Sequence, residues 1–176
     1  MDKILIPSEF VREAREYALA SRSHTSDRHD FHEGGLAAKQ RKMYEGKLGE
    51  KLVKHLFIQS GIIFQEDKSP HTEADSYDFI LPDGKTIDVK TRTQPFHTRT
   101  LEMVEQFKRA PKDLYISVRL FPDELSGYII GWASNMDFLR TNRIENNGYL
   151  DNYVLMDHEL RTWNDLIRRL TNNGDQ

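Results

Sequence analysis

The stretch SYDFILPDGKTIDVKTR, residues 76–92, decides how this 176-residue chain is expected to fold around its candidate site. Two runs rich in β-branched and aromatic residues flank the segment PDG, residues 82–84. That segment is typical of a three-residue hairpin loop with glycine in the left-handed position. Pairing residues outward from such a loop places Asp78 directly opposite Asp88. The pattern therefore predicts two antiparallel strands with a fixed register.

The predicted hairpin has one apolar and one polar face, because side chains alternate along a strand. The apolar face contains Tyr77, Phe79, Leu81, Ile87 and Val89. The polar face contains Asp78, Ile80, Thr86, Asp88 and Lys90. Two facing aspartates have Cβ atoms roughly 5 Å apart and repel each other. A magnesium-like cation, which prefers oxygen ligands, would compensate them, and Lys90 could hold a phosphate or oxyanion beside it. The alternative is a solvated face on which Lys90 only neutralises Asp88.

A third acid, Glu50, lies in EGKLGEKLVKHLF on a helix predicted over residues 36–60. Gly46 and Gly49 precede it, and each glycine costs a helix about 1 kcal/mol. Their presence favours close packing or close approach of a ligand. The simpler interpretation of Glu50 is an ion pair with Lys54, four residues later on the same helix.

An acid on a helix, an aspartate on a strand and D-x-K on the next strand resemble the motif of the PD-(D/E)XK nuclease superfamily. The matching elements are GKLGE, which ends at Glu50, YDF around Asp78, and IDVK, which contains Asp88 and Lys90. The resemblance covers residues 36–92. The proline of the family's name is absent, since a tyrosine precedes the first aspartate.

The resemblance implies a site that hydrolyses phosphodiester bonds, usually in DNA. Glu50, Asp78, Asp88 and the backbone carbonyl of Val89 would hold one or two Mg²⁺ or Mn²⁺ ions. Lys90 would position or activate the water and stabilise negative charge in the transition state. The four catalytic candidates are thus Glu50, Asp78, Asp88 and Lys90.

The order of expected elements predicts an α+β chain, and the resemblance implies a restriction-endonuclease-like α/β/α core with a central mixed β-sheet flanked by helices. We expect one domain over residues 1–176, with the core at about 36–133 and N-terminal helix–loop and C-terminal strand–helix extensions. The expected helices are 8–21, 36–60, a short one after residue 134, and 158–170. The expected strands are 62–66, 76–81, 85–92, 113–120, 127–133 and 148–155.

Composition supports one ordinary globular domain, with 38% hydrophobic and 30% charged residues. The absence of cysteine excludes disulfides, thiol catalysis and iron–sulfur clusters. The most apolar stretch, YIIGWA at 128–133, is far shorter than the ~18 residues of a membrane span. We therefore expect no membrane partner and a cytoplasmic location.

The net charge of −3 hides segregation along the sequence. Residues 36–54 contain six bases and two acids, a net charge of +4, and residues 85–109 contain six bases and three acids, a net charge of +3. Such basic segments are compatible with phosphate binding, although solvated element faces are the alternative. The candidate nucleic-acid contacts are Lys39, Arg41, Lys42, Lys47, Arg92 and Gln94.

The sequence thus favours a Mg²⁺- or Mn²⁺-dependent DNA endonuclease acting on double-stranded or branched DNA. An exonuclease or a junction-resolving nuclease would use the same residues. A catalytically inactive nucleic-acid-binding module of the same fold is the other alternative, but inactive relatives typically lose one of the four catalytic residues. The apolar stripe of the C-terminal helix is expected to pack within the chain, with a homodimer interface as the alternative. The pair His29 and His32 could bind a transition metal or lie in a polar loop.

Overall fold

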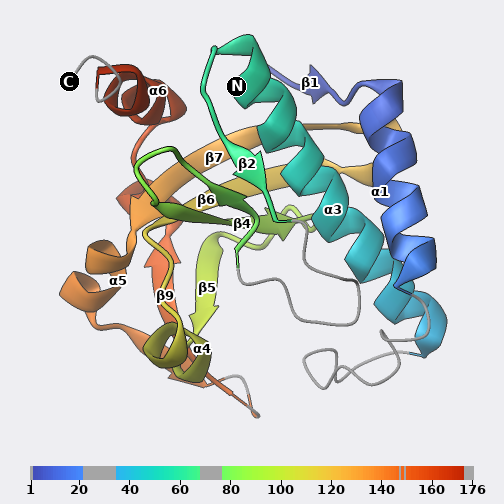
Figure 1. The fold of residues 1–176 in the computed structure, drawn as a ribbon. Helices are drawn as coiled ribbons and strands as arrows, with labels where there is room; N and C mark the ends of the chain where they lie inside the picture. Colours follow the sequence, from blue (N-terminus) through green and yellow to red (C-terminus); the bar gives the residue numbers. More distant parts are fainter. Residues whose placement is uncertain (1, 22–34, 68–76, 147, 149, 173–176) are drawn as a thin grey trace.

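The computed structural model describes residues 2–21, 35–67, 77–146, 148 and 150–172. This part of the chain folds as an α+β protein in which a curled mixed sheet is flanked by helices (Figure 1). The predicted class and the central mixed sheet are therefore confirmed. The candidate pair His29 and His32 lies outside the described residues.

Two sheets and five α-helices make up the described chain. The helices are α1 (Ser8–Ala20), α3 (Leu36–Gln59), α4 (Val104–Arg109), α5 (Asn135–Thr141) and α6 (Trp163–Asn172). The larger sheet contains β1 (Ile4–Leu5), β2 (Gln65–Glu66), β3 (Phe79–Ile80), β4 (Thr86–Arg92), β6 (Leu114–Phe121) and β7 (Ser126–Ser134). The smaller sheet contains β5 (Arg99–Met103), β8 (Ile144–Asn146) and β9 (Asp151–Met156).

The larger sheet has the order β1-β7-β6-β4-β3-β2. Its central pair, β4 and β6, is parallel, whereas the other neighbours are antiparallel. Parallel neighbours require a crossover connection, and here the chain between them forms β5 and α4. Strand β5 then joins the second sheet, which has the order β5-β9-β8.

The hairpin between β3 and β4 has the predicted register, with Phe79 opposite Ile87 and Ile80 opposite Thr86. Gly84 has a φ of +83°, the left-handed conformation that favours glycine, and its amide donates to the Leu81 carbonyl at 2.9 Å. The β3 strand is shorter than predicted, however. It contains only two residues, so Asp78 lies just outside the strand.

Helices α1 and α3 lie side by side on one flank of the larger sheet, and α4 and α5 lie on the opposite flank (Figure 1). The main core fills the space between α1, α3, α6 and the sheet. As predicted for the C-terminal helix, α6 packs within the chain, because Leu166 is buried and the Trp163 ring stacks on Phe57 at 5.6 Å.

The other flank contains elements that the sequence did not predict, namely β5, α4 and β8. A smaller core lies here, in which Phe107, Tyr115, Phe138 and Tyr153 pack together. These elements are three to six residues long, too short for a periodic apolar pattern to distinguish them from loops. The second layer is consequently a small sheet with two short helices rather than helices alone.

Within the described residues, no helix is both long and apolar enough to cross a membrane.

Candidate functional site

Asp78 lies at the point where pairing between β3 and β4 ends. Its backbone amide donates to the Ile87 carbonyl at 2.9 Å, and its carboxylate Oδ2 accepts a hydrogen bond from the Val89 amide at 2.6 Å. The carboxylate thus occupies the place where a neighbouring strand would have paired. Asp78 and Asp88 therefore do not face each other within a continuous ladder as the hairpin register predicts. Asp78 is held at the edge of β4 instead.

Among the described residues, β3 pairs only with the first two residues of β4, and no strand pairs with this edge beyond Ile87. The N–H and C=O groups of one strand residue point to the same side. Because the Val89 amide faces Asp78, the Val89 carbonyl faces the same edge. The predicted carbonyl ligand and the Asp78 carboxylate are consequently on one side of the strand.

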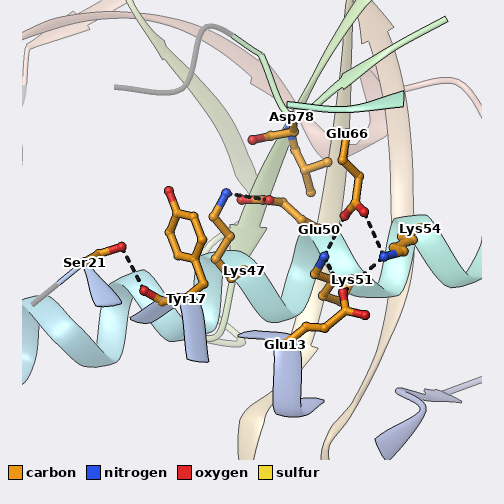
Figure 2. Close-up of polar contacts among 10 residues, drawn as sticks. Glu13, Tyr17, Ser21, Lys47, Glu50, Lys51, Lys54, Glu66 and Asp78 are labelled. Atoms are coloured by element: carbon orange, nitrogen blue, oxygen red, sulfur yellow. Dashed lines mark hydrogen bonds and ion pairs between the residues drawn. The ribbon is translucent and has the colours of Figure 1, made fainter. Parts of the chain in front are cut away.

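Glu50 comes to this edge from the middle of α3, as Figure 2 shows. Its Oε2 accepts a hydrogen bond from Lys47 Nζ at 2.8 Å. The Lys47 ammonium also lies 4.2 Å from the centre of the Tyr17 ring. The simpler interpretation of Glu50, an ion pair with Lys54, is wrong in this structure, because Lys54 pairs with Glu13 and Glu66.

Four charged residues behind Glu50 form a network that joins α1, α3 and β2 (Figure 2). Lys51 lies 2.8 Å from Glu13 and 2.6 Å from Glu66, and Lys54 lies 3.1 Å and 2.8 Å from the same carboxylates. Both lysines are therefore occupied by α1 and β2, and the network stabilises the position of α3 from which Glu50 reaches Asp78.

Two of the predicted acids, Glu50 and Asp88, act electrostatically on the third, Asp78. Burial raises the pKa of Asp78 well above its ordinary value, and the charges of Glu50 and Asp88 raise it further. The Lys47 charge and the Val89 hydrogen bond oppose this effect without cancelling it. Asp78 is therefore a buried carboxyl group that holds its proton more tightly than a free aspartic acid does.

Lys90 lies between two carboxylates on the other face of β4. Its Nζ is 2.8 Å from Asp88 Oδ2 and 2.5 Å from Glu102 Oε2. Burial alone would lower the pKa of Lys90, but the charges of Asp88 and Glu102 outweigh burial and raise it above the ordinary value. Lys90 is thus a fixed ammonium ion at neutral pH.

Glu102, on β5, was not predicted as a site residue. Its side chain is only 1% exposed, and its Oε1 has no hydrogen-bond partner in the described structure. Burial raises the pKa of Glu102, Lys90 lowers it and Asp88 raises it again, with a net increase. The only sequence signal for Glu102 was an acid within RTLEM. Alternation along this stretch favours burial of Leu101 and Met103, but both are half-buried in the structure.

Arg92 was predicted to contact nucleic acid, and the structure contradicts this. Its side chain is 8% exposed, and its guanidinium donates to the carbonyls of His97 and Arg99, both at 3.0 Å, and to Asp157 at 2.7 Å. A buried guanidinium with these partners cannot reach a phosphate. The even residues of β4 face the second sheet at this point, so Arg92 supports the segment that follows it.

The other predicted nucleic-acid contacts lie at varied distances from the acids. Gln94 is exposed, and its backbone carbonyl accepts from Arg119. Lys47 contacts Glu50 inside the site. The other three candidates are Lys39, Arg41 and Lys42, in the first two turns of α3. Each is eight or more residues before Glu50, a separation of at least about 12 Å along the helix.

As the side chains stand, no three His, Asp or Glu residues among those described converge closely enough to hold an ion together. The oxygen donors of Glu50, Asp78, Asp88 and Val89 nonetheless suit a hard cation, and the raised pKa of Asp78 reflects charge that such a cation would offset. The residues present therefore fit Mg²⁺ or Mn²⁺ in chemistry, although they do not form a closed cage.

No protein-family model, curated protein or solved structure matches this chain.

Proposed function

We propose that this protein is a metal-dependent nuclease of the PD-(D/E)XK type that hydrolyses phosphodiester bonds in DNA, most simply as an endonuclease. The observation that carries the proposal is the buried Asp78 carboxyl beside β4, whose pKa Glu50 and Asp88 raise further, with Lys90 paired to Asp88 on the same strand. A purely structural strand edge gains nothing from a buried carboxyl group whose ionisation two further carboxylates oppose.

The arrangement of elements supports a restriction-endonuclease-like core. Helix α3 bears the first acid, the β3–β4 hairpin bears the other two, and the chain then crosses over to β6, parallel to β4. This order of helix, hairpin and D-x-K strand is also the order of the residues that carry the family resemblance. Glu50 from α3 and Asp88 from β4 both act electrostatically on Asp78, which lies at the start of the hairpin.

The acidic residues would hold the cation. Asp78 and Asp88 are the central ligands in this proposal, with the Val89 carbonyl on the same edge and Glu50 completing the set or orienting a water. When bound, a divalent cation would lower the pKa of water and neutralise phosphoryl charge. The Asp78 carboxylate, already held by the Val89 amide, would need little reorganisation.

Lys90 would act as a cation toward the phosphate. Because Asp88 and Glu102 raise its pKa, the side chain is an ammonium ion at neutral pH and cannot accept a proton from water. Its role is therefore to orient a phosphoryl oxygen and stabilise the charge that develops there. Glu102 would be a positioning residue that holds this ammonium in place.

The test is incubation of the full chain with supercoiled plasmid, linear duplex and branched DNA in Mg²⁺, Mn²⁺ or EDTA. Cleavage is expected in the metals and not in EDTA. Asp88→Asn and Lys90→Ala are each expected to reduce the rate by at least about 100-fold. The matched control is Asp83→Asn, the same change on the exposed turn of the same hairpin, where activity is expected to be unchanged.

Cleavage that persists in Asp88→Asn at the rate of Asp83→Asn would disprove the assigned site. If the intact protein binds these DNAs but cleaves none of them in either metal, the inactive binding module replaces the enzyme as the interpretation. Nicked plasmid as the first product supports an endonuclease, whereas gradual shortening of linear DNA alone supports an exonuclease.

A further inference from the structure

The segment 93–98, between β4 and β5, displays an aromatic ring to solvent next to the candidate site. Phe96 is 73% exposed. Its ring lies 4.7 Å from the His97 ring in an edge-on arrangement, with an interplanar angle of 80°. An exposed phenylalanine contributes little to folding, and its ring is accessible to a ligand.

Two buried arginines fix that segment from below. Arg92 donates to the carbonyls of His97 and Arg99, and Arg119 donates to the carbonyls of Gln94 and His97. Both guanidinium groups come from the central strands β4 and β6, where Arg92 and Arg119 are neighbours. Burying a cation costs free energy that such hydrogen bonds must offset. The chain therefore uses two buried charges to hold a short loop in one shape.

A hollow of about 510 Å³ lies beside this loop, and the residues that line it include Phe96, His97, Arg99 and Lys90. This volume falls in the range of small-ligand sites. The hollow shares Lys90 with the candidate site, so an occupant would lie next to the phosphate that Lys90 contacts. The nearby cations already have partners, because Arg99 pairs with Glu145 and Lys90 pairs with two acids.

We propose that this hollow receives an unstacked nucleotide next to the phosphodiester under attack, with its base against the Phe96 ring. The inference rests on the proposed function and specifies its substrate as DNA with a single-stranded or opened segment. Because the nearby cations are paired, the affinity would come mainly from stacking, which is worth about 1–3 kcal/mol per base and tolerates any base sequence. Stacking contributes little salt dependence, unlike phosphate contacts.

The test is fluorescence anisotropy with a labelled 12-nucleotide single strand, the matching blunt duplex and the same duplex with a short single-stranded flap. Ca²⁺ replaces Mg²⁺ in one series and EDTA in another. The wild type is expected to prefer the single strand and the flap over the blunt duplex. Phe96→Ala is expected to weaken single-strand binding about 10-fold with an unchanged salt dependence, and Phe96→Tyr is expected to restore it. Ile63→Ala is the matched control, because Ile63 is equally exposed at 74% but does not line the hollow.

Equal single-strand affinities for Phe96→Ala and Ile63→Ala would overturn the inference, as would failure of the wild type to bind the single strand in either series. The two proposals fail in different ways. Metal-dependent cleavage with an affinity that does not depend on Phe96 leaves the nuclease and removes the stacking site. A loss of single-strand affinity specific to Phe96→Ala in a protein that cleaves no DNA leaves the stacking site and removes the nuclease.

Discussion

Asp78 has two effects on the free energy of folding, and they oppose each other. Its carboxylate completes the hydrogen bonding of the β4 edge by accepting from Val89, yet burial and the nearby Glu50 and Asp88 charges raise its pKa. Such a residue makes the folded state less stable at neutral pH in the absence of a cation. This cost is expected at a site that binds charge, where local strain is retained for function.

The first prediction follows from the direction of that pKa shift. In the folded protein the Asp78 pKa is raised, so its ionisation disfavours folding increasingly as the pH rises above the unfolded value of about 3.9. Asp78→Asn keeps an oxygen acceptor for Val89 and removes the charge. We expect the variant to be more stable than the wild type at pH 7–8 without divalent metal, and this gain should shrink toward pH 4. Urea unfolding at several pH values measures it.

The control is Asp83→Asn on the same hairpin. Lys85 lowers the pKa of Asp83, so removal of that charge is expected to have no effect or to destabilise slightly. Equal stability of Asp78→Asn and the wild type at pH 7–8 would show that the acids do not crowd one another. Asp78→Asn is also expected to lose cleavage. A variant that is more stable yet inactive would separate the effect of Asp78 on stability from its effect on function.

Helix α3 approaches β4 closely at Gly49. A Cβ atom built on Gly49 would lie 1.9 Å from Thr91 Oγ1, whereas a Cβ on Gly46 would have no neighbour within 4 Å. Only one of the two helix glycines is therefore required for packing. Close packing, which the sequence predicted as a reason for the two glycines, is confirmed for Gly49, where α3 packs against Thr91 of β4.

This difference gives a matched pair of substitutions. Gly49→Ala is expected to destabilise the protein by about 1–3 kcal/mol, because the added methyl group forces α3 away from β4. Gly46→Ala is expected to stabilise by up to about 1 kcal/mol through helix propensity. Chemical denaturation measures both changes. If the two variants prove equally stable, α3 does not approach β4 as closely as the structure shows.

At the scale of the whole molecule, a net charge of −3 is compatible with the proposed nucleic-acid substrate. Burial and the charges of Glu50 and Asp88 raise the pKa of Asp78, a divalent cation in the proposed site would offset these acids, and Lys90 pairs with Asp88. Mixed charge at the candidate site, rather than a uniformly basic surface, is what the proposed chemistry requires.

Cation binding at this edge should stabilise the whole fold. A ligand that binds only the folded state at 100 times its dissociation constant adds about 2.7 kcal/mol. For a domain of this size that corresponds to a rise in Tm of about 5–10 °C. We expect this rise when Mg²⁺ or Mn²⁺ is added to the wild type and to Asp83→Asn, and none in Asp88→Asn, as measured by thermal unfolding at constant ionic strength. An equal rise in all three proteins would place the bound cation elsewhere.

The elements that follow from local chemistry were predictable. The PDG loop determines its own hairpin register, and the apolar periodicity of α1, α3 and the C-terminal helix identifies each within a few residues. Short elements such as β5 and α4 were not predictable, because three to six residues carry too little pattern. Their positions depend on pairing with β9, which is about fifty residues distant in the sequence.

Turn chemistry and helix periodicity act between residues near in the chain, so the sequence alone predicted the hairpin and the helix that bears Glu50. The set Glu50, Asp78, Asp88 and Lys90 comes from the family resemblance and stays a prediction. Only the tertiary structure decided where Arg92 points and that Glu102 is buried beside Lys90. Those two outcomes depend on how the second sheet packs against β4. Such packing joins residues far apart in sequence, and the free energy of burying a charge depends on the partners it meets there.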